Sequence, residues 1–163
     1  MTTPAPADGS ETGEVRVSPY RAQYHDSVAA FITMHAFGTE YRDELELVRS
    51  CDSGWIAHVG AGGGGIVGVL LLQGTHVRSL AVMERCRRRG IARLLCNALL
   101  ASPLGQHPLT LALDRQWRYY MLLHARVARA GFHCADEACE GGSELWRRFP
   151  RSDVGPSGDD EPM

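Results

Sequence analysis

The 163-residue sequence contains no lysine, so all 17 of its basic residues other than histidine are arginine. Its 19 acidic residues leave a formal net charge of −2. The chain as a whole therefore has no basic bias towards nucleic acid or an anionic membrane. Any anion that it binds must be held by guanidinium groups and main-chain amides.

Cysteine is sparse, and its odd number and scattered spacing give no sign of a disulfide framework. A reducing compartment is expected. The nearest approach to a metal-binding pattern is His133 and Cys134 with Cys139, but no second pair stands at ligand spacing, so we expect no metal. The cysteines are Cys51, Cys86, Cys96, Cys134 and Cys139.

Long apolar runs are also missing. The longest, Ile66–Leu72, is far shorter than the ~20 residues that a membrane-spanning helix needs. The N-terminus has no basic region followed by an apolar run, which a signal peptide would have. We therefore expect a cytoplasmic protein with no membrane contact.

Hydrophobic residues make up 44% and charged residues 22% of the chain, which is typical of a soluble globular protein and enough for one domain. Residues 1–14 and 151–163 are polar, contain proline and acidic residues, and show no periodicity. Such segments bury too little apolar surface to offset the entropy of ordering. We expect two disordered tails, the second acidic, around a folded domain of residues 15–150.

The hydrophobic pattern of this domain predicts a strand, two helices, three strands, a helix, a strand, a helix and two strands, in that order. The glycine-rich segment 60–65 is interpreted as a hairpin, because no Gly-Lys-Ser/Thr follows it and no helix begins after it. The order indicates a mixed α/β (α+β) sheet with helices on both faces. The predicted strands are Val15–Pro19, Trp55–Val59, Ile66–Gln73, Thr75–Val82, Leu109–Leu113, Phe132–Cys134 and Glu144–Phe149, and the predicted helices are Tyr24–Phe37, Tyr41–Cys51, Gly90–Ala101 and Trp117–Ala130, with a loop at Pro103–Pro108.

The segment from Val77 to Ala101 is the most informative about function. A strand ends at Val82, a basic turn follows, and a helix begins at Gly90. The apolar stripe of this helix, which suits packing on a sheet, consists of Ile91, Leu94, Leu95, Ala98 and Leu99.

Five arginines crowd onto this turn and the first residues of the helix. A helix N-terminus carries the positive end of the dipole, so cations there are unfavourable unless an anion offsets them. Gly90 and Ala92 keep the turn free of bulk, which lets main-chain amides approach a phosphate closely. A phosphate-bearing ligand is the preferred interpretation, and a solvated basic turn is the alternative. The arginines are Arg85, Arg87, Arg88, Arg89 and Arg93.

The run Arg87-Arg88-Arg89-Gly90-Ile91-Ala92 resembles the acyl-CoA motif of the GNAT acetyltransferase superfamily, which reads Arg/Gln-x-x-Gly-x-Gly/Ala. The preceding Leu80-Ala81-Val82 is similar to that family's fourth strand, and the order of elements over some 130 residues, with Gly131-Phe132 after the last helix, is similar to its fold. The resemblance implies about seven strands, of which the fourth and fifth splay apart, and acetyl-CoA bound in the resulting cleft as the acyl donor.

The resemblance also implies which residues hold the cofactor. The main chain of Leu80 and Val82 would pair with the pantetheine arm. The side chains of Arg87, Arg88 and Arg93 are expected to reach phosphates, whereas Arg85 and Arg89 are expected to stay solvated. The residues whose amides would hold the pyrophosphate are Arg87, Arg88, Arg89, Gly90, Ile91, Ala92 and Arg93.

The general acid is where the chain departs from the family. Members often carry a tyrosine four residues before the Gly-Phe pair, and Val127 stands there. His124 and Tyr120 lie one and two turns earlier on nearly the same helix face, so either is a candidate, directly or through a water. Both also suit half-buried packing positions. Tyr119 points elsewhere and is less suited.

The candidate bases are Glu84 and His76, at opposite ends of the fourth strand. Glu84 also suits a solvated charge that balances the arginines, and a chain of waters could replace both. The acceptor would meet the first two helices and their loop, where the acidic side chains either attract a cationic amine or form a solvated face. The residues concerned are Phe37, Glu40, Tyr41, Asp43 and Glu44.

The sequence therefore predicts an N-acetyltransferase that transfers an acetyl group from acetyl-CoA to a primary amine of a small molecule or protein. The alternative is a catalytically degenerate sensor or interaction module that binds acyl-CoA, which the missing tyrosine favours. The acidic tails, the few aromatic residues and the negative net charge argue against a nucleic-acid-binding domain. A homodimer stays open, since dimers are common among similar proteins.

Overall fold

The computed structural model describes residues 13–35, 41–60, 65–114, 120–138 and 143–150. The two predicted tails, 1–14 and 151–163, fall outside these residues except for positions 13 and 14.

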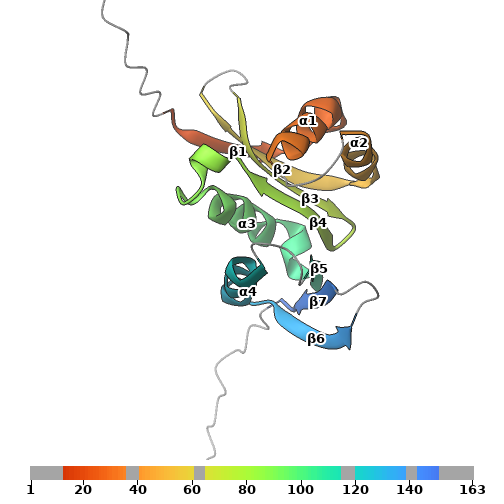
Figure 1. Ribbon diagram of the computed structural model, residues 1–163. Coiled ribbons are helices and arrows are strands. Elements are labelled where there is room, and N and C mark those ends of the chain that lie inside the picture. Colours follow the sequence, from red (N-terminus) through yellow and green to blue (C-terminus); the bar gives the residue numbers. More distant parts are fainter. Residues whose placement is uncertain (1–12, 36–40, 61–64, 115–119, 139–142, 151–163) are drawn as a thin grey trace, which may run out of the picture.

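The described residues form one seven-stranded sheet and four α-helices (Figure 1). The predicted order of elements and the mixed sheet are confirmed. In chain order they are β1 Val15–Pro19, α1 His25–His35, α2 Tyr41–Ser50, β2 Ser53–Val59, β3 Ile66–Gln73, β4 His76–Val82, α3 Ile91–Ala101, β5 Leu109–Asp114, α4 Tyr120–Arg129, β6 His133–Ala138 and β7 Ser143–Arg148.

Some local predictions differ from the structure. Residues 22–24 form a 3₁₀ turn, so α1 begins at His25 and not at Tyr24. The predicted loop after α3 contains a second 3₁₀ turn, Pro103–Gln106, whose first residue is a proline with the φ that such a turn requires. Strand β6 continues beyond Cys134 to Ala138, because β7 pairs with it as far as Glu144.

The sheet has the order β1-β2-β3-β4-β5-β7-β6, and only its β4–β5 pair is parallel. That pair is short: its register consists of His76 opposite Thr110 and Val77 opposite Leu111. Beyond it, β4 continues to Val82 beside β3, and β5 continues to Asp114 beside β7. The predicted splay between the fourth and fifth strands is confirmed.

Helices cover both faces of the sheet, as predicted (Figure 1). On one face, Val28 and Ile32 of α1 and Val48 of α2 pack on Val69 and Leu71 of β3. On the other face, a second cluster unites α3, α4 and the central and C-terminal strands through Leu70, Leu95, Leu99, Leu109, Phe132 and Trp146. None of the described helices is long and apolar enough to cross a membrane.

Helix α3 approaches the sheet most closely over Gly68 of β3. A Cβ atom at Gly68 would lie 2.8 Å from Cγ2 of Ile91 and 3.1 Å from Cδ1 of Leu95. Glycine therefore leaves the room that the first two turns of α3 occupy. This contact fixes where the N-terminus of α3 lies relative to β4.

The apolar stripe predicted for α3 is correct except at Leu94. Ile91, Leu95 and Leu99 are buried, whereas Leu94 is 42% exposed. Three residues at spacings of four are enough to seat an 11-residue helix, and Leu94 lies at the edge of that face.

We expect Leu95→Ala to lower the free energy of unfolding by about 2–5 kcal/mol, because it opens a cavity at a fully buried position. The matched control Leu94→Ala on the same helix should cost less than about 1 kcal/mol. Urea unfolding followed by circular dichroism measures both. Equal losses would show that α3 packs on a different face.

Candidate functional site

A β-bulge separates the part of β4 that pairs with β5 from the part that does not. Leu72 lies opposite Val77 and Leu71 lies opposite Ser79, so Arg78 has no partner on β3. An extra residue of this kind bends its strand. Beyond it, main-chain groups that would otherwise face one neighbouring strand face the opposite side. The bulge follows directly on Val77, the last residue of β4 that pairs with β5. Sequence reasoning missed it, because an arginine in a strand carries no signal of a bulge.

Beyond the bulge, Leu80 and Val82 direct their main-chain N–H and C=O groups towards the splay. The Met83 amide donates to the Val67 carbonyl over 2.9 Å. Bonded and non-bonded pairs alternate along antiparallel strands. The main-chain groups of Ala81 therefore also bond to β3, while those of Val82 and Leu80 point away from β3. Both residues predicted to pair with a pantetheine arm thus offer polar main-chain groups on the diverging side.

The turn between β4 and α3 presents main-chain amides. Arg88 and Gly90 both have a positive φ, 66° and 79°, and the first helical bond runs from Leu94 N to Gly90 O over 3.0 Å. The amides of Ile91, Ala92 and Arg93 precede that bond, no described side chain caps the helix, and its first turn has no acidic residue. Such an end attracts anions.

The arginine side chains surround this turn unevenly. Arg85, Arg88, Arg89 and Arg93 are exposed, and Nε of Arg85 lies 3.2 Å from Sδ of Met83. The half-buried Arg87 instead donates to two main-chain carbonyls, from Nε to Val82 and from Nη2 to His35, each over 3.2 Å. Its guanidinium, predicted to reach a phosphate, thus contacts β4 and the end of α1.

His76 lies where β4 and β5 are still paired. Its Nδ1 is 2.8 Å from Oγ1 of Thr110, its register partner on β5. Burial, and then the charge of Arg78, lower the pKa of His76 below the ordinary 6.5. The ring is therefore neutral at neutral pH and able to accept a proton.

Glu84 lies in the basic turn, in the 3₁₀ segment Glu84–Cys86, and its side chain is exposed. This position agrees with the solvated-charge interpretation. It also leaves the carboxylate accessible, so a role as a base stays a prediction.

The candidate acids lie on α4. Tyr120 is its first residue and His124 is one turn further on, but the described part of the chain does not include their side chains, nor Tyr119 at all. Val127 is half-buried and packs against the core cluster shared with α3. The position that often holds a tyrosine therefore contributes only to packing.

The predicted acceptor residues are only partly described. Phe37 and Glu40 fall outside the described ranges, and so does the side chain of Tyr41. Asp43 is exposed, whereas Glu44 is only 7% exposed, in contrast to a solvated helix face. Helix spacing could have shown this, because Glu44 lies one turn before the buried Val48 and therefore on the same face of α2.

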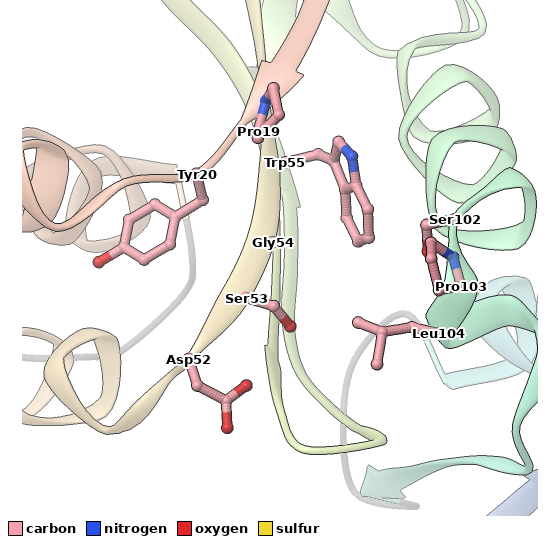
Figure 2. Close-up of a pocket in the computed structure, with 9 residues that line it drawn as sticks. All are labelled: Pro19, Tyr20, Asp52, Ser53, Gly54, Trp55, Ser102, Pro103 and Leu104. Carbon is pink, nitrogen blue, oxygen red and sulfur yellow. The ribbon is translucent and has the colours of Figure 1, made fainter.

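Of two hollows among the described residues, the first adjoins this region, because Met83 and His35 line it. This hollow, of about 710 Å³, is bounded by α1, the first three strands and Met83. The other, of about 460 Å³, lies between Trp55 of β2 and Leu104 beyond the C-terminal end of α3 (Figure 2). The basic turn is at the N-terminal end of α3, about 16 Å away by the length of that helix. The second hollow therefore belongs to neither the splay nor the turn.

Comparisons with known proteins find matches by structure but not by sequence. No protein-family model and no curated protein matches the chain. Solved structures do match. A GNAT-family acetyltransferase from Staphylococcus aureus Mu50 is 14% identical, with a TM-score of 0.65, and the match covers 83% of this chain and 98% of that one.

Two further matches were solved with bound ligands. Diaminobutyrate acetyltransferase from Paenibacillus lautus, solved with diaminobutyric acid and coenzyme A, is 18% identical with a TM-score of 0.58 and covers 88% and 99% of the two chains. NAA60 from Arabidopsis thaliana, solved with a bisubstrate analogue, is 16% identical with a TM-score of 0.58 and covers 83% and 98%.

The chain has the GNAT fold. The resemblance noted in the sequence is thereby confirmed for the architecture. One fold can support many different activities. Within the GNAT fold, the splay of β4 and β5 and the turn before α3 are the parts that the sequence motif pointed to.

We expect stability to fall as the pH falls from about 7.5 to about 5, partly because of His76. Its unfolded pKa is about 6.5 and its folded pKa is lower, so between these values the unfolded chain binds more protons and the free energy of unfolding rises with pH. His76→Gln should reduce this dependence. The control is Gln106→Asn, an exposed substitution shortly before β5 that changes no titratable group. Urea unfolding at both pH values would refute the assignment if the two variants behaved alike.

Proposed function

We propose that this protein binds acetyl-CoA in the splay between β4 and β5 and transfers the acetyl group to a primary amine of a small molecule or protein. The observation that carries the proposal is the continuity of main-chain groups from Leu80 and Val82 to the uncapped start of α3. Such a run of main-chain groups matches a ligand that has amide groups followed by a diphosphate.

In this proposal the pantetheine arm extends β4 on its open side, by bonds to the main chain of Leu80 and Val82. The pyrophosphate lies on the turn, held by the amides from Arg87 to Arg93, which include Gly90, Ile91 and Ala92. The exposed Arg88, Arg89 and Arg93 add charge around it. Guanidinium forks suit phosphate oxygens, and the chain has no lysine to do so.

Acetyl transfer also requires a polarised carbonyl, a deprotonated amine and an acid for the departing thiolate. Amides beyond the bulge would polarise the thioester. Neutral His76 at the closed end of the splay, or Glu84, would take the proton of the ammonium. Tyr120 or His124 would protonate the sulfur, although a thiol pKa of ~8.5 permits departure without an acid at a penalty of about 10²-fold.

The proteins of the same fold support the choice of substrates. One of them is named as an acetyltransferase and was solved with coenzyme A and an amino acid that carries a second amine. At 18% identity this likeness supports an amine acceptor as a class and not a particular amine.

One observation favours a second candidate function, an acyl-CoA sensor without turnover. Val127 packs into the core at the position where a tyrosine would face the sulfur. The sensor would bind acetyl-CoA as tightly but would release no thiol. A thiol-release assay over a panel of small amines and peptide N-termini distinguishes the two, since turnover with any amine excludes the sensor.

Gly90→Leu should abolish acetyl-CoA binding measured by calorimetry. A Cβ atom at Gly90 meets no protein atom within 4 Å, so a side chain there would occupy the space proposed for the diphosphate. The control is Gly74→Leu, which also has a positive φ and open space around it, in the β3–β4 turn. Both variants should lose about 1–2 kcal/mol of stability to backbone strain. Undiminished binding by Gly90→Leu would place the cofactor elsewhere.

Tyr120→Phe and His124→Gln test the acid. If either residue protonates the thiolate, its variant should lower kcat in the thiol-release assay by about 10²-fold and leave the affinity for acetyl-CoA nearly unchanged. His133→Gln, at an exposed position on β6, is the control. Unchanged turnover in both variants would dismiss both residues as acids.

A further inference from the structure

Arg87 joins two segments that are far apart in the sequence. Its Nη2 donates to the carbonyl of His35, 52 positions earlier, and its Nε donates to the carbonyl of Val82. His35 is the last residue of α1, and Val82 is the last residue of β4. A single guanidinium therefore bridges the helix on the proposed acceptor side and the strand on the proposed donor side.

The contact with His35 is a C-terminal cap of α1. The last carbonyls of a helix have no partner within it and carry the negative end of its dipole, so a cation that donates to one of them is stabilising. His35 itself does not supply that charge. Burial, and then the charge of Arg87, lower the pKa of His35, and its ring lies tilted against Phe31 with centroids 4.6 Å apart. Among the described residues, Arg87 supplies this cap.

The contact with Val82 places the same guanidinium at the donor strand. Val82 directs its C=O towards the splay, where the proposal puts the pantetheine arm. The main chain of Arg87 begins the turn proposed for the diphosphate, while its side chain reaches across to α1. Movement of this turn on cofactor binding would therefore be transmitted to the end of α1.

Resting on the proposed function, we propose that Arg87 is a positioning residue that couples the two substrate sites: it caps α1 from the cofactor turn, so that acetyl-CoA on the turn orders the acceptor-side helix. Its effect is on the amine substrate, not on cofactor affinity. The competing role for Arg87 is a direct phosphate ligand.

The variant Arg87→Lys separates these two roles. Lysine keeps the positive charge that a phosphate ligand needs, but its single ammonium cannot reproduce a fork that serves two carbonyls. Under the positioning role, Arg87→Lys should resemble Arg87→Ala. Under the phosphate role, it should resemble the wild type. Arg85→Ala is the matched control, because it removes the same charge from the same turn, and the described hydrogen bond of Arg85 goes to Met83 and not to α1.

Hydrogen exchange at the amides of residues 31–35, without any ligand, tests the cap. Exchange should accelerate about fivefold in Arg87→Ala and in Arg87→Lys and stay unchanged in Arg85→Ala. Acetyl-CoA should then slow this exchange in the wild type and in Arg85→Ala, but not in the two Arg87 variants. In steady-state kinetics, the Arg87 variants should raise KM for the amine about fivefold and change the acetyl-CoA dissociation constant less than about twofold.

Unchanged exchange at residues 31–35 in both Arg87 variants would overturn the proposal, even where acetyl-CoA binds and turnover is normal. So would a large loss of cofactor affinity in Arg87→Ala that Arg87→Lys restores, since that is the behaviour of a phosphate ligand. If acetyl-CoA fails to bind the wild type, the proposed function and the coupling fall together. The exchange measured without ligand still decides whether Arg87 caps α1.

Discussion

Beyond Val77, the described main chain of β4 has a sheet neighbour on one side only. The bulge at Arg78 turns the N–H and C=O groups of Leu80 and Val82 to the side that β5 has left. The Val82 carbonyl accepts a hydrogen bond from Arg87, and a ligand with amide groups of its own could bond to the N–H groups of Leu80 and Val82 and to the Leu80 carbonyl. The remaining features serve this edge: Gly68 brings α3 close to the sheet, and α3 in turn sets its N-terminus beside the end of β4.

A site built on main-chain atoms leaves few marks in the sequence. It requires a bulge, a glycine of positive φ and room above Gly68, and it tolerates most side chains elsewhere. Solved structures match over most of the chain at 14–18% identity, while no family model and no curated sequence does. The side chains that would carry chemistry, such as His76, can differ without altering the cofactor path.

Predictions from the sequence succeeded where the determining interactions are local. The stripe through Ile91, Leu95 and Leu99 and the turn at Gly90 depend on neighbours a few residues away, and both are present. Contacts between distant segments were not accessible. The bulge at Arg78 depends on the register with β3, and the two bonds of Arg87 depend on where α1 ends.

The exclusive use of arginine has a chemical consequence for a cleft that would hold a thioester. A lysine ε-amine beside such a donor is itself an acceptor once it loses its proton, and acylation would cancel its charge. A guanidinium keeps its proton at any physiological pH and has no free lone pair with which to attack the carbonyl. The cations of the turn from Arg85 to Arg93, which the proposal places around the diphosphate, would therefore not be consumed by the acyl donor that they hold.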